Sequence, residues 1–142
     1  MTERLLTLGI GCRRGITVQH VESAVLAALG ARSLAQVRQV ATIEDKTAEP
    51  GLVEFCHRHA LPLRGIARDR IAGLAPEAFT ESDAASRHVG VRAVSEPCAL
   101  LGARNGVLVT AKTAYDGVTV AIAMDTLDAG PSIVSASEGV AL

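Results

Sequence analysis

A strand-length apolar run that ends in glycines and leads into a helix constrains the fold of this chain more than any other feature. Residues 5–10 read Leu-Leu-Thr-Leu-Gly-Ile, and Gly11-Cys12-Arg13-Arg14-Gly15 follow before Thr17 opens a helical pattern. A strand that turns through glycines into a helix leaves backbone N–H groups unpaired beside the positive end of that helix. Such a turn receives anions, and the two arginines add fork-shaped donors that suit carboxylate or phosphate. We therefore expect an anionic ligand at this turn.

Strand and helix patterns alternate along the rest of the chain. Helix starts are predicted at Thr17, at Glu49-Pro50 and at Ser95-Glu96-Pro97, because Thr suits the N-cap position and Pro the first helical turn. Apolar spacing then predicts strands at 5–10, 37–43, 107–110 and 118–124 and a short strand that ends near 66, with helices at 17–29, 49–60, 68–73, 82–88 and 95–103.

This alternation predicts one α/β domain. Right-handed βαβ crossovers give a mixed, mostly parallel sheet flanked by helices. Asp116-Gly117, within a connection at 111–117, predicts a C-terminal β-hairpin. We expect this domain to occupy residues 1–125, and residues 126–142, which lack periodicity, to form a disordered tail.

Composition excludes several function classes. Only three residues are aromatic and none is Trp, whereas single-stranded nucleic-acid binding depends on aromatic stacking. The net charge is −1 and no run of Lys or Arg exceeds two residues, so a nucleic-acid footprint is also absent. No segment has the apolar length of a signal peptide or of a membrane span. The three cysteines lie more than forty positions apart and form neither a disulfide framework nor a metal motif. We expect a cytoplasmic protein that binds neither nucleic acid nor membrane.

Ligands of open α/β sheets bind beyond the carboxyl ends of the strands. That rule groups segments 11–17, 42–49 and 95–98, with Lys112 as an addition from the hairpin connection. The candidate substrate-binding residues are Gly9, Gly11, Cys12, Arg13, Arg14, Thr42, Lys46, Ser95 and Lys112. The candidate catalytic residues are the carboxylates Asp45, Glu49 and Glu96.

Each of these candidates also has a plain structural interpretation. Cys12 is either a thiol whose pKa is lowered by the helix start and two arginines, or a small half-buried filler. Asp45 and Glu49 are either an acid–base group or part of a solvated charge cluster, and His20 either reaches the sheet edge where the ligand is expected or faces solvent. No metal site emerges. No cofactor is predicted either, because Gly15 comes one residue too late for a dinucleotide fingerprint.

Four motifs in sequence carry a family resemblance. They are GIGCRRG at 9–15, ATIEDKTAEPGL at 41–52, SEPCALLGA at 95–103 and KTAYDGVTVAIA at 112–123. Together they resemble the CobE family of cobalamin biosynthesis and the homologous C-terminal domain of CbiG, over residues 5–124. The resemblance implies a free-standing CobE-type protein. CbiG-type proteins carry a further N-terminal domain, open the δ-lactone of a cobalt-precorrin and release a two-carbon fragment as acetaldehyde.

The resemblance implies binding of a precorrin-stage tetrapyrrole, a macrocycle fringed with carboxylates. The protein would serve as a carrier or take part in a ring-modification step, alone or with another enzyme of the pathway. A first alternative is a stand-alone lactone hydrolase, in which amides of 11–13 polarise the lactone and Asp45, Glu49 or Glu96 activates water. A second alternative is a nucleotide-binding α/β module. The oligomeric state stays open.

Overall fold

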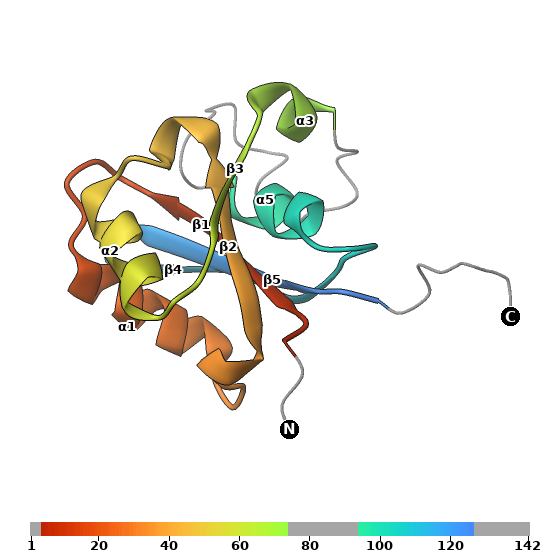
Figure 1. Ribbon diagram of the computed structural model, residues 1–142, viewed down its shortest axis with the longest axis horizontal. Coiled ribbons are helices and arrows are strands. Elements are labelled where there is room, and N and C mark those ends of the chain that lie inside the picture. Colours follow the sequence, from red (N-terminus) through yellow and green to blue (C-terminus); the bar gives the residue numbers. More distant parts are fainter. Residues whose placement is uncertain (1–3, 74–93, 127–142) are drawn as a thin grey trace, which may run out of the picture.

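Five strands form one mixed sheet in the order β3-β2-β1-β5-β4 (Figure 1). The structure, a computed structural model, describes residues 4–73 and 94–126. Strands β1, β2 and β3 are parallel, whereas β5 runs antiparallel to β1 and pairs with β4 as a hairpin. The strands are β1 (Leu6–Cys12), β2 (Val37–Ile43), β3 (Leu63–Ile66), β4 (Val107–Tyr115) and β5 (Val118–Met124). The predicted α/β class and C-terminal hairpin are confirmed, with the parallel strands gathered at one edge.

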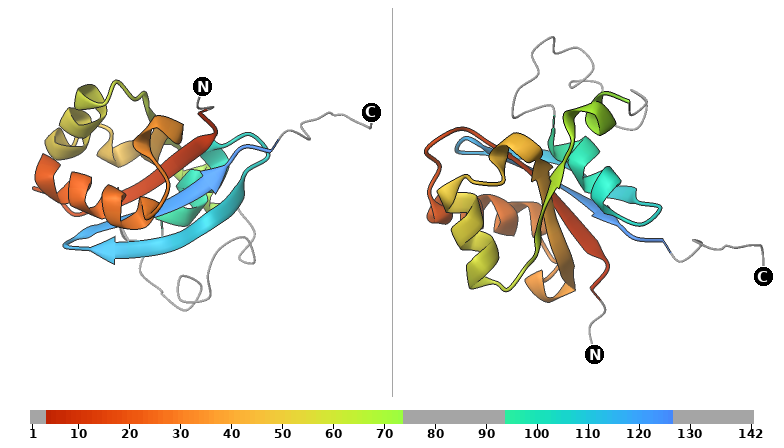
Figure 2. Two further views of the ribbon diagram at one scale, coloured as in Figure 1. Left: turned by 90° about the horizontal axis from the view of Figure 1, so that it is seen from below. Right: turned by 45° about the horizontal axis from the view of Figure 1, so that its top comes forward.

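Helices cover both faces of the sheet (Figure 2). The helices are α1 (Val18–Leu29), α2 (Pro50–Arg58), α3 (Arg68–Ala72) and α5 (Ser95–Gly102), with short 3-10 turns η1 (Leu34–Gln36) and η2 (Glu44–Lys46). Helices α1 and α2 share one face because the crossovers from β1 to β2 and from β2 to β3 move in the same direction and keep the same hand. Helix α5 packs on the opposite face.

Local capping chemistry places the helix ends where the sequence predicts them. The Thr17 side chain accepts a hydrogen bond from the amide of His20 (3.2 Å) and begins α1. Gly30 ends α1 at a φ of 58°, a conformation that glycine adopts without strain. Pro50 begins α2, where its missing N–H costs nothing.

The main core lies between the sheet and helices α1 and α2. Alternate residues of β1 (Leu6, Leu8, Ile10 and Cys12) point into it. Gly9 points to the other face, where a Cβ would collide with the carbonyl oxygen of Ser95 and lie 2.8 Å from the Ala99 Cβ. Gly9 therefore allows α5 to lie directly on the strand, which is a packing role, and the ligand contact predicted for it stays a prediction.

Two predicted boundaries are wrong. Strand β1 continues through Gly11 to Cys12, since β5 pairs with it along its full length. Strand β4 continues to Tyr115, which reduces the connection predicted at 111–117 to Asp116-Gly117 and places Lys112 inside a strand. The predicted helix at 82–88 and almost all of the predicted tail at 126–142 lie outside the described residues.

No helix in the ranges 4–73 and 94–126 is both long enough and apolar enough to span a bilayer.

Candidate functional site

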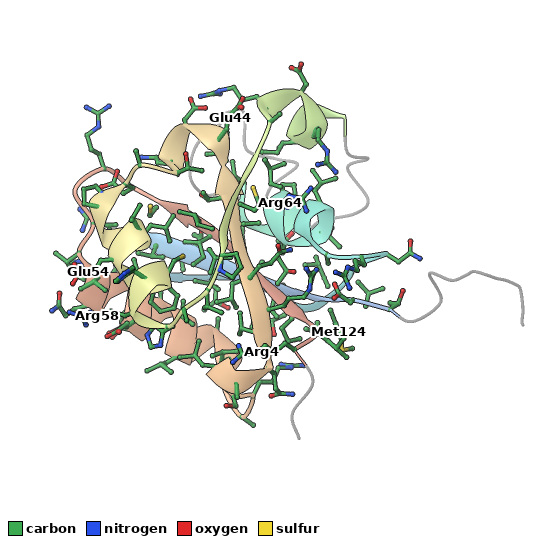
Figure 3. All side chains as sticks on the ribbon, in the orientation of Figure 1. Arg4, Glu44, Glu54, Arg58, Arg64 and Met124 are labelled. Atoms are coloured by element: carbon green, nitrogen blue, oxygen red, sulfur yellow. The ribbon has the colours of Figure 1, made fainter. Side chains whose placement is uncertain are left out.

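Three loops meet at the carboxyl end of the parallel strands. The amide of Arg13 donates to the carbonyl of Gly117 (3.2 Å), and the amide of Gly15 donates to the carboxylate of Glu49 (2.9 Å). We call this region the rim and define it as residues 13–17, 44–49 and 115–118. Figure 3 shows Glu44 beyond the end of β2 near α3, while Arg4 and Met124 mark the opposite end of the sheet. The sequence correctly grouped the first two loops, but it did not place the hairpin turn with them.

The backbone amides of the glycine turn are occupied from within the chain. Arg13 gives its amide to the hairpin turn, so that amide is not available to polarise a ligand as predicted. The carboxylate of Glu49 takes the amide of Gly15, a residue with φ 82°. An internal carboxylate thus sits where a phosphate would bind at this glycine, which disfavours the nucleotide-binding alternative.

Three cations of the rim have side chains without a partner. Arg13 and Arg14 are exposed and Lys46 is half-buried. None of the three side chains makes a hydrogen bond or ion pair with another residue in 4–73 or 94–126. The Arg13 side chain lies against Gly117, where a Cβ would collide with its guanidinium. The rim therefore presents three cationic side chains, and their predicted contact with a ligand stays a prediction.

The three candidate carboxylates lie in different environments. Asp45 is exposed and pairs with Arg68, whose hydrogen bond holds the pKa of the Asp45 carboxyl below its usual value. Glu96 is fully buried at the start of α5, and its carboxylate accepts the amide of Lys112 (2.8 Å). Glu49 is half-buried at the rim, with Oε2 on the Gly15 amide and Oε1 without a hydrogen bond to any described residue. Among these three, Glu49 is the rim carboxylate that is half-buried and makes no ion pair with any described residue.

Cys12 belongs to the core. Its side chain is 0% exposed, and burial raises the pKa of its thiol to about 11, although the nearby Lys46 lowers it and Glu49 raises it further. The predicted lowering of this pKa is wrong, because the desolvation of the thiolate exceeds the effect of the positive charge. Of the two interpretations of Cys12, the structure favours a small side chain that fills space in the core, and it is fully rather than half buried.

The remaining candidates are structural in their contacts. Thr42 is buried and its hydroxyl donates to the carbonyl of Ile10 (2.7 Å), which ties β2 to β1. The carbonyl of Gly11 accepts the hydroxyl of Thr119 (3.3 Å). Ser95 is buried at the start of α5, and its hydroxyl has no hydrogen-bond partner in the described part of the chain. These residues lie beneath the rim rather than on it.

Sequence reasoning missed the contribution of the hairpin turn. Asp116 Oδ2 lies 3.3 Å from Nε2 of His20, whose Nδ1 lies 3.0 Å from the hydroxyl of Thr17. His20 therefore reaches the rim, the first of its two interpretations. The Asp-Gly pair predicted the turn itself, but only the pairing of β5 with β1 carries it to the loop after β1.

The fold and the rim define a class, namely open α/β domains that present unpaired cations at the carboxyl ends of their parallel strands. Residues 6–123 match the family model described as "Cobalamin synthesis G C-terminus". The chain belongs to this family, and it is a cobalamin-biosynthesis protein of the CobE/CbiG type, as the four motifs indicated.

Two curated relatives are longer than this chain. A probable cobalt-precorrin-5A hydrolase of Methanocaldococcus jannaschii is 34% identical over 133 residues, which cover 86% of this chain and 41% of the relative. A cobalt-precorrin-5A hydrolase of Priestia megaterium is 26% identical over 127 residues, which cover 88% of this chain and 33% of the relative. The chain thus spans less than half the length of either relative.

Two solved structures match most of both chains. The crystal structure of CobE, a protein of the cobalamin (vitamin B12) pathway, is 33% identical with a TM-score of 0.73, over 84% of this chain and 89% of that one. The cobalamin biosynthesis protein chiG from Agrobacterium tumefaciens is 33% identical with a TM-score of 0.65, over 86% of this chain and 99% of that one. At this identity and coverage the fold extends over almost the whole of both neighbours.

Proposed function

We propose that the rim binds a precorrin-stage tetrapyrrole through the carboxylates at the edge of its ring. The observation that carries this proposal is the set of three cations, Arg13, Arg14 and Lys46, whose side chains have no partner among the described residues. They lie where open α/β sheets receive ligands. Charge-assisted hydrogen bonds to carboxylates are the strong polar contacts that such side chains make.

The test replaces two rim cations and measures affinity. Each charge-assisted hydrogen bond contributes roughly 1.5–3 kcal/mol when shielded from water, so R13Q/K46Q should bind more than about tenfold more weakly. The measurement is an anaerobic absorbance titration with cobalt-free precorrin-stage tetrapyrroles. A matched control, R32Q/R64Q, removes two exposed arginines outside the rim and should keep wild-type affinity. Equal affinity for R13Q/K46Q and wild type would place the ligand elsewhere.

A second candidate function is lactone hydrolysis, which the position of Glu49 favours. The Gly15 amide fixes one carboxylate oxygen, while Oε1 is left beside the cations of the rim. Oε1 would take a proton from water as the water oxygen adds to the lactone carbonyl carbon. The ester carbon–oxygen bond then breaks, and the departing oxygen takes that proton from Glu49 to become a hydroxyl, while the new carboxylic acid releases its own proton to solvent. Lys46 and Arg13 would stabilise the negative oxygen of the intermediate.

The two carboxylates of the same loop separate catalysis from binding. Loss of a general base costs roughly a hundredfold or more in turnover, so E49Q should lose acetaldehyde release and keep its affinity within a few-fold. D45N, which alters the carboxylate paired with Arg68, should keep both acetaldehyde release and affinity. If the wild-type protein binds saturably but releases no acetaldehyde, the result would support the carrier function and contradict the hydrolase function. Undiminished turnover by E49Q would exclude Glu49 as the base.

A further inference from the structure

Tyr115 is an exposed aromatic side chain at the rim. It is the last residue of β4 and its exposed fraction is 47%. Its hydroxyl makes no hydrogen bond with any described residue. The chain contains only two other aromatic residues: Phe55 is 0% exposed in the core, and Phe79 lies outside the described residues.

The strand register places Tyr115 at the end of a row across the sheet. Cys12 pairs with Val118, and Val118 pairs with Tyr115, so the three side chains share the face that α1 and α2 cover. Cys12 and Val118 are buried in the core, while about half of the Tyr115 side chain on the edge strand is exposed to solvent. Two strand spacings separate Cys12 from Tyr115, or about 10 Å between their Cα atoms.

The hairpin turn joins Tyr115 to the cationic part of the rim. Arg13 directly follows Cys12, its amide donates to Gly117, and its guanidinium rests on Gly117, two residues after Tyr115. Asp116, between them, is held by His20 of α1 (3.3 Å). The aromatic ring and the guanidinium are thus fixed at neighbouring positions on one turn.

We propose that the ring of Tyr115 stacks on the conjugated face of the tetrapyrrole while Arg13 binds a carboxylate at its periphery. This inference rests on the proposed function. A tetrapyrrole is apolar across its faces and charged at its edge, so a complementary site needs an aromatic surface next to cations. Aromatic rings stack on flat conjugated ligands with an offset geometry. Within the described residues, this turn is where an exposed aromatic residue and an unpaired arginine occur together.

The first experiment is the absorbance titration repeated with Y115L, Y115F and the control V107A. Val107 lies at the opposite end of β4 and is equally exposed (46%). Stacking predicts about tenfold weaker binding for Y115L and nearly unchanged binding for Y115F and V107A. Wild-type affinity for Y115L overturns the inference. Equal weakening in Y115F and Y115L also overturns it, because the hydroxyl rather than the ring would then carry the contact.

A second measurement uses the wild-type protein and does not depend on the folding of a variant. The chain contains a single tyrosine, so nitration by tetranitromethane, followed on the peptide containing Tyr115, reports on this ring alone. Saturating tetrapyrrole should slow nitration several-fold, and an unchanged rate overturns the inference. If wild type binds tetrapyrrole and both measurements leave Tyr115 unaffected, only the stacking fails. If wild type binds no tetrapyrrole, the proposed function fails with it.

Discussion

Cys12 and Arg13 are adjacent in the chain but lie in opposite environments. The thiol is 0% exposed in the core, whereas the guanidinium is exposed and unpaired among the described residues. Side chains alternate between the two faces of a strand, and β1 ends at Cys12, so one residue separates the core from the rim. The charge beside the thiol does not activate it, because burial sets its pKa at about 11.

The first prediction concerns thiol reactivity. Burial raises the pKa values of Cys12 and Cys56 to about 11 and that of Cys98 to about 12, from an ordinary value of 9.0. In the native protein near pH 8, none of the three should react with Ellman's reagent, while all three should react in guanidinium chloride. A thiol that reacts rapidly in the native state, located by peptide mapping, would contradict the buried position of that cysteine.

The same raised pKa values predict how stability depends on pH. Between the unfolded value of 9.0 and about 11, the folded chain keeps thiol protons that the unfolded chain loses. The free energy of unfolding should therefore be intact below pH 9 and should fall as the pH rises through this window. Urea unfolding at several pH values measures it. Replacing all three cysteines with Ala should flatten the dependence that these thiols cause.

Helix α5 lies close to the sheet because small residues form its contact surface. Gly9 of β1 faces Ser95 and Ala99, and Gly102 faces Ala41 and Thr7 (3.1 Å each from a built Cβ). The amide of Gln39 also donates to the hydroxyl of Thr7 (3.1 Å). The close spacing between α5 and the sheet thus depends on the absence of side chains at Gly9 and Gly102.

Another prediction tests the contact between α5 and the sheet with a pair of glycine substitutions. G9A places a methyl group against the backbone of α5 and should destabilise the fold by about 1–3 kcal/mol or more, by overpacking. In G15A no atom lies within 4 Å of the new Cβ. The substitution should therefore lower stability only through the strain of an alanine at a φ of 82°, by about 1–2 kcal/mol. Urea unfolding compares the two variants. A G9A protein more stable than G15A would contradict the direct packing of α5 on β1.

The two ends of the molecule differ in how their charges are used. At the rim, Arg13, Arg14 and Lys46 have no partner among the described residues. At the opposite end, both carboxylate oxygens of Asp125 accept hydrogen bonds. Both of its oxygens accept from Arg38 (3.0 and 3.1 Å), and Oδ1 also accepts the amide of Arg104 (2.8 Å). Asp125 is 6% exposed and joins β2, the end of β5 and the loop after α5. Ligand binding is thus proposed at one end of the sheet, and the ion pair of Asp125 with Arg38 stabilises the other end.

The last prediction separates ligand binding at the rim from stabilisation by Asp125. D125N removes the charge that neutralises a largely buried arginine and should cost about 2–4 kcal/mol of stability, while tetrapyrrole affinity stays at the wild-type level. The control D116N alters a 59% exposed carboxylate and should cost less than about 1 kcal/mol. Thermal unfolding and the absorbance titration provide the readouts. Affinity lost in D125N under conditions where it is fully folded would contradict the assignment.

The sequence by itself determined where the described helices begin, where most of the strands lie, and to which family the chain belongs. Thr17, Gly30, Pro50 and Asp116-Gly117 act on backbone groups within a few residues of themselves, so their effects can be predicted locally. Strands 37–43 and 118–124 match the structure, and the short strand after 63 ends at Ile66 as predicted, because their apolar patterns are local. The four motifs correctly indicated the family.

Only the tertiary structure decided what each candidate side chain contacts. Glu49 meets the amide of Gly15, 34 residues away, and Glu96 of α5 meets the amide of Lys112 in β4, 16 residues away. The hairpin turn reaches Arg13 because β5 pairs with β1, over a separation of more than a hundred residues. Burial and charge pairing arise from contacts between segments that are distant in the chain, and local patterns contain no information about which segments will meet. The residue types of the rim can therefore be predicted from the sequence, but their partners cannot.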